Sequence, residues 1–203
     1  MTLTVDALLP LSFLEAVRAV DRPDEDPDAE FVAELRNKRL GLSDTVYAQI
    51  RRYTEAARRQ QRQRADEVAG IARLIARRPD AEAVFHAAGR YLGERAYEAL
   101  PGHTRRVAHG LPALLARPFV HRQLRRLARR YFGGTVRRDG AAVVLEVPAL
   151  VAGGGPHGAA CAYYEAGFRE LVQRLVGGAR AAVEHVHGDA DGGCRWRAEW
   201  GTS

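Results

Sequence analysis

The chain lacks several features that mark particular classes of protein. Only two of its 203 residues are cysteines, which excludes a disulfide framework and favours a metal site or a pair of buried thiols. No apolar run approaches the roughly 18 residues that a membrane-spanning helix requires. The amino terminus carries neither a basic segment nor a small-residue cleavage site, so we expect a cytoplasmic protein without a signal peptide.

Lysine and aromatic residues are also scarce. Lys38 is the only lysine, so the net charge of +6 comes almost entirely from arginine. A basic chain makes a polyanionic partner a candidate, but the abundance of alanine and glycine beside arginine also indicates a bias in genomic base composition. Aromatic residues make up 7% of the chain, and no basic segment carries the interleaved aromatics of a base-stacking surface. An arginine-rich nucleic-acid-binding regulator is therefore an alternative hypothesis and not the first one.

Helical patterns dominate the first half. Residues 1–10 predict a loose arm or a short strand, and Ser12-x-x-Glu15 is a capping-box pattern that predicts a helix beginning at Ser12. A second short helix is predicted over 29–39. The run 58–64 contains no apolar residue and predicts either a solvated stretch of helix or a joint.

The middle of the chain continues this pattern. Asp80 is a predicted N-cap, and a helix over 81–100 contains Gly89-Arg-Tyr-Leu-Gly93, a small-residue face where a neighbouring backbone could approach closely. A further helix is predicted over 111–132. We divide the chain into a helical extension, residues 1–80, and a ligand-binding-type α+β domain, residues 81–203.

The spacing of the apolar residues then changes from the helical period to the alternation of a β-strand. The segments predict two β-hairpins on either side of a helix: 135–138 with 141–147, the helix over 161–175, and 179–187 with 194–200. The glycine-rich loop 148–158 lacks the spacing of a phosphate-binding loop, which excludes nucleotide binding there. The predicted fold is α+β: a helical amino-terminal half followed by a ββαββ unit whose small antiparallel sheet packs on helices.

This order of elements resembles a known family. A helix, Gly-Gly, a hairpin, a cysteine-led helix containing Ala-Gly-Phe, a strand and a glycine-rich turn into Cys-aromatic are similar to the 4-vinyl-reductase domain family, over about residues 81–200. That family shares its fold with haem–nitric-oxide-binding domains and TRAPP Golgi-tethering subunits. The resemblance implies a bacterial, non-catalytic small-molecule-sensing or accessory domain that forms a homodimer. An accessory factor of tetrapyrrole or aromatic metabolism is a further alternative.

The resemblance also implies a zinc site. Aligned with the phenol-sensing relatives, the ligands are Cys161, Glu184, His187 and Cys194, with His187 in place of a cysteine, and four protein ligands make such a site structural. Strand alternation disagrees in part, because it places His185 and His187 on one face and Glu184 on the other. His185 in place of Glu184 is therefore the alternative ligand. Cys161 or Cys194 with His185 is the only nucleophile candidate, and no spacing favours catalysis over metal binding.

The expected ligand is a small hydrophobic or aromatic molecule, and haem is not expected. The sequence from residue 143, VVLEVPAL, offers no Tyr-x-Ser-x-Arg clamp for the haem carboxylates, which the haem-binding relatives need. Candidate lining residues of a pocket between helix and sheet are the neighbouring aromatic side chains, although ordinary core packing is the favoured explanation for most of them. They are Tyr131, Phe132, Tyr164, Phe168 and Trp196.

Overall fold

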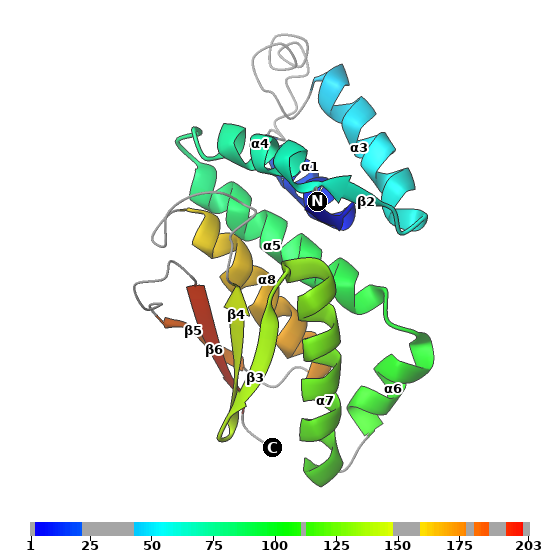
Figure 1. The fold of residues 1–203 in the computed structure, drawn as a ribbon, viewed down its shortest axis with the longest axis vertical. Coiled ribbons are helices and arrows are strands. Elements are labelled where there is room, and N and C mark those ends of the chain that lie inside the picture. The colour runs from blue at the N-terminus through cyan, green and yellow to red at the C-terminus, as the bar shows by residue number, and fades with distance from the viewer. Residues whose placement is uncertain are drawn as a thin grey trace, which may run out of the picture.

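The computed structural model describes residues 3–21, 43–110, 113–147, 159–177, 181–186 and 194–200. It confirms the α+β class, with helices packed on one face of a small antiparallel sheet (Figure 1). The predicted helix over 29–39 lies outside the described residues. In chain order the elements are β1 (Thr4–Asp6), α1 (Leu8–Val20), α3 (Asp44–Arg58), β2 (Arg62–Arg64), α4 (Ala65–Ile75), α5 (Ala81–Glu98), α6 (Gly102–Gly110), α7 (Ala113–Leu127), the π-helix η3 (Ala128–Phe132), β3 (Thr135–Asp139), β4 (Ala142–Val147), α8 (Ala160–Leu175), β5 (Ala181–Val186) and β6 (Cys194–Trp200).

Both predicted strand pairs form and join into one sheet. Its order is β3-β4-β6-β5, and all neighbours are antiparallel. Alternate residues of the two central strands are buried on the face that α8 covers: Val143, Leu145 and Val147 from β4, and Cys194, Trp196 and Ala198 from β6. Helix α8 in turn lies between this sheet and α5, so the carboxy-terminal half is a sheet backed by two layers of helix (Figure 1).

Helices α5 and α8 cross at glycines, as the small-residue face of α5 predicts. A Cβ added at Gly89 would overlap the carbonyl oxygen of Tyr163. A Cβ added at Gly93 would lie 2.6 Å from the carbonyl oxygen of Gly167. Because both glycines face backbone, which cannot rotate away as a side chain can, the two helices pack closer than side chains would allow.

The amino-terminal helix α1 shares this core. The Phe13 ring packs edge-on against Phe85 of α5 with centroids 5.7 Å apart, and it lies 5.0 Å from the Tyr163 ring of α8. All three rings are fully buried. Apolar contacts therefore cross the predicted boundary at residue 80, and one core cluster contains residues from both sides of it.

The prediction that Ser12 caps α1 is wrong. The helix begins at Leu8, and buried Ser12 lies inside it with its hydroxyl donating to the Leu9 carbonyl oxygen at 2.7 Å. The Leu8 N–H instead donates to the Asp6 carboxylate at 3.0 Å. Starting the helix earlier buries Leu8 and Leu9, and this apolar burial outweighs the local capping pattern.

The run 58–64 is a joint, one of the two structures predicted for it. After α3 the chain passes through Gln60, which has a positive φ of 54°, into the short strand β2. Strand β2 pairs with β1 in antiparallel register, with Thr4 opposite Arg64. The β1–β2 pairing thus holds α1 and α3 together, and α1 packs against α5.

An ion-pair cluster fixes the turn before α5. The Arg78 guanidinium donates to the Asp21 carboxylate at the end of α1, at 2.6 Å, and to Asp80, at 2.7 Å. Asp80 is the N-cap residue of α5, as predicted, but its side chain accepts from Arg78 and not from the helix backbone. Hydrogen bonding from Arg78 lowers the pKa of the Asp80 carboxyl. The folded protein therefore favours the ionised carboxylate of Asp80.

We predict opposite effects from the same substitution at two helical glycines. Gly89→Ala destabilises the fold by about 1–3 kcal/mol, because the new methyl group collides with the backbone of α8. Gly70→Ala, in α4 with nothing within 4 Å of its added Cβ, stabilises the fold by roughly 0.5–1 kcal/mol through helix propensity. Urea denaturation followed by circular dichroism measures both, and a similar change for the two variants would contradict the close crossing.

A second prediction concerns pH. Because the pKa of Asp80 is lowered by folding, its contribution to stability is present above the ordinary carboxyl value of 3.8 and is lost as pH falls through the lower folded value. The unfolding free energy of the wild type should therefore exceed that of Asp80→Asn at neutral pH. The difference should shrink below about pH 4 and be lost as the pH falls through the lower pKa of the folded state. A difference that stays constant over this range would disprove the role of the ionised carboxylate.

Candidate metal centre

Cys161 occupies the first turn of α8. It is the second residue of this helix and is half-buried. The first-turn N–H groups have no partners within the helix, and together with the helix dipole they favour a negative charge nearby. A thiolate at this position is therefore stabilised, and a thiolate is the form of cysteine that binds metals.

Cys194 and His185 come from the two neighbouring strands. Cys194 begins β6, is buried on the face covered by α8, and lies opposite Val147 of β4. His185 lies in β5 opposite Trp196, and its ring stacks on the indole with centroids 5.2 Å apart and an interplanar angle of 20°. Trp196 in turn stacks on Tyr164 of α8 at 5.3 Å. This stack orients the imidazole toward the space between sheet and helix.

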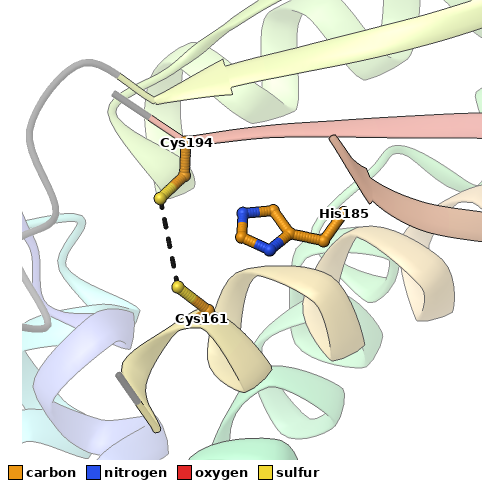
Figure 2. Close-up of side chains that lie close together, drawn as sticks. All are labelled: Cys161, His185 and Cys194. Carbon is orange, nitrogen blue, oxygen red and sulfur yellow. Dashed lines mark hydrogen bonds between the residues drawn. The ribbon is translucent and has the colours of Figure 1, made fainter. Parts of the chain in front are cut away.

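The three side chains converge (Figure 2). The sulfur atoms of Cys161 and Cys194 are 3.9 Å apart, and the ligand atoms of the two cysteines and His185 all lie within 4.8 Å of one another. Two thiolates bound at about 2.3 Å to a tetrahedral zinc are about 3.8 Å apart. A disulfide, by contrast, needs about 2.05 Å. The sulfur spacing therefore fits zinc, and the His185 imidazole is close enough to serve as a third ligand.

No family model, curated protein or solved structure matches the chain. The chemistry of the cluster therefore has to be argued from its own geometry. A neutral imidazole and two thiolates form a donor set that suits zinc and other borderline or soft metals better than magnesium or calcium, which prefer oxygen ligands. Among the helices that the structure describes, none is both long enough and apolar enough to cross a membrane.

The structure does not bring Glu184 into this cluster. Its side chain is exposed, on the face of β5 opposite to His185, and Glu184 pairs in register with Arg197. The strand is regular to Val186, so the alternation that favours His185 holds. His187, the other predicted ligand from this segment, lies outside the described residues. The arrangement thus assembles the alternative ligand set, with His185 in the place that the family resemblance gave to Glu184.

The aromatic residues predicted to line a ligand pocket divide into two groups. Phe132, Tyr164, Phe168 and Trp196 are at most 2% exposed and belong to the core between α8 and the sheet. Tyr131, at 4% exposed, also lines a cavity on the helical side of the molecule.

We predict that zinc content separates His185 from its neighbour. His185→Gln should lower bound zinc well below that of the unmutated protein, because the cluster loses its only described nitrogen ligand. Glu184→Gln, one residue away on the exposed face, should leave zinc content unchanged. Inductively coupled plasma mass spectrometry of both purified variants measures this, and the reverse ranking would restore Glu184 as the ligand.

Proposed function

We propose that the chain is a non-catalytic small-molecule-sensing or accessory domain whose ββαββ unit is pinned by a structural zinc. The observation that carries the proposal is the 3.9 Å separation of the Cys161 and Cys194 sulfurs beside the His185 ring. Such a zinc would join three segments: the first turn of α8, strand β6 and the edge strand β5.

The position of β5 explains what the metal would add. This strand is at the edge of the sheet, and β6 is the only described strand that pairs with it; Arg169 of α8 also donates to its Val183 carbonyl oxygen at 3.2 Å. A ligand on β5 shared with β6 and α8 adds a tie between the sheet edge and the helix layer. Because zinc binds the assembled ligands and not the scattered ones of the unfolded chain, its binding free energy adds to the free energy of unfolding.

A fourth protein ligand would make the site closed and structural. The family resemblance assigns this position to His187, and a His187→Gln variant tests that assignment by the same zinc measurement. Membership of the 4-vinyl-reductase domain family, a homodimeric state and a cytoplasmic location belong to the same proposal. The described order of hairpin, cysteine-led helix and second strand pair supports the first of these.

The proposal predicts about one zinc per chain in the purified protein. Cys161→Ser and Cys194→Ser should each reduce this amount sharply, and a chelator should lower the melting temperature of the wild type but not that of the cysteine variants. Adding zinc back to the chelated wild type should restore its melting temperature. A zinc content well below one per chain in the unmutated protein would sink the metal proposal. Native mass spectrometry of the same sample tests the small-molecule role by revealing any retained ligand.

A further inference from the structure

The structure contains a cavity that is separate from the metal centre. Its volume is about 400 Å³, within the range of small-molecule sites, which is about 300–1,000 Å³. Its lining residues come from β1, α1, α3, α5 and η3 and the turns that follow α3 and α5; none comes from α8 or from the four-stranded sheet. The cavity therefore lies on the helical side of the molecule, among α1, α3, α5 and η3.

Part of the cavity wall is apolar. Leu8 and Leu11 of α1 contribute from one side, and Tyr131 of η3 from another. These three side chains are at most 8% exposed, so the wall is fixed by the core and not by mobile surface groups. An apolar wall of this kind accommodates a hydrocarbon or aromatic body.

The charges around the cavity do not cancel. Its lining includes Arg58, Arg95 and Arg130 but only two carboxylates, Asp6 and Glu98. Arg130 donates to Asp6 at 3.1 Å, and Arg95 donates to Glu98 at 2.9 Å. Within the described part of the chain, Arg58 is thus the lining cation that has no ion pair, and it is exposed. One net positive charge is left at the opening.

The π-helix η3 brings a cation and an aromatic ring to this cavity. Residues at consecutive positions, Arg130 and Tyr131, both line it. The Arg130 guanidinium lies 5.0 Å from the Tyr131 ring centroid, and Arg95 lies 5.3 Å from the ring of Tyr91. Stacking on aromatic rings limits the motion of both guanidinium groups. Single π turns are frequent at functional sites, and this one is an observation independent of the charge count.

We propose that this cavity binds a small amphipathic carboxylate. Its carboxylate pairs with Arg58 at the opening, and its apolar body contacts Leu8, Leu11 and Tyr131. A monoanion matches the single excess positive charge, whereas a phosphate monoester carries about −1.5 to −2 at neutral pH and exceeds it. The inference rests on the proposed small-molecule role and names the class of ligand and its place.

The test uses four probes on the full-length protein as purified: octanoate, 4-phenylbutyrate and their uncharged amides. Isothermal titration calorimetry should show each acid binding at least about tenfold more tightly than its amide, since the charge-assisted hydrogen bonds to Arg58 are lost with the amide. Arg58→Gln should abolish this preference. Arg51→Gln, an exposed arginine of the same helix that does not line the cavity, should keep it.

Three outcomes would overturn the inference: no binding of any probe, equal binding of acid and amide, or a preference that survives Arg58→Gln. Zinc content measured on the same samples is independent of all three. Zinc near one per chain without probe binding therefore rejects the cavity ligand and leaves the metal centre intact. Probe binding by a protein that carries no zinc rejects the metal centre and leaves the cavity ligand intact.

Discussion

The contact between α5 and α8 at Gly89 is the constraint on which the rest of the structure depends. It places the backbone of α5 against the carbonyl of Tyr163, two residues after Cys161, and so sets the position of the first turn of α8. The sheet then packs on the opposite side of α8 through Trp196, which stacks on Tyr164. Because the helix layer and the sheet are held at a fixed spacing, the thiol of Cys161 reaches Cys194. A larger residue at Gly89 would move α8, the helix that carries the Cys161 thiol, although Gly89 itself lies in neither of the two strands that contribute to the site.

Local patterns predicted the carboxy-terminal half well. Alternation of buried and exposed residues is a direct consequence of strand geometry, so all four strands of the sheet and the helix between them could be read from the sequence. Interactions distant in sequence explain what the local patterns missed. A short strand is one of the two structures predicted for residues 1–10, and β1 confirms it, but its partner β2 was not predicted, because these three-residue strands pair across almost sixty positions, as the Arg62–Thr4 hydrogen bond with a separation of 58 shows. Ser12 fits a capping box locally, but burial of Leu8 and Leu9 extends the helix past it.

The candidate metal centre was predictable from the sequence only in part. Two cysteines in a chain without a disulfide framework indicate Cys161 and Cys194 as candidate metal ligands, and the structure brings them together. The choice between Glu184 and His185 depended on which face of β5 meets α8. Strand alternation gives the relation between the two residues, but only the packed sheet tells which face is inside. The cavity had no sequence signal, because five separate elements contribute its wall.

Helix α5 separates the two candidate sites. Gly89 and Gly93 face α8, whereas Tyr91 and Arg95, two positions further along in each case, line the cavity. Two residues correspond to about 200° around an α-helix, so these pairs lie on opposite sides of it. A metal that ties β5 and β6 to α8 and a ligand held among α1, α3 and α5 would thus contact different faces of one buried helix. Substitutions such as Arg58→Gln and His185→Gln share no partners and belong to separate layers, so their effects on stability should add, and a departure from additivity in the double variant would show that α5 transmits strain between the layers.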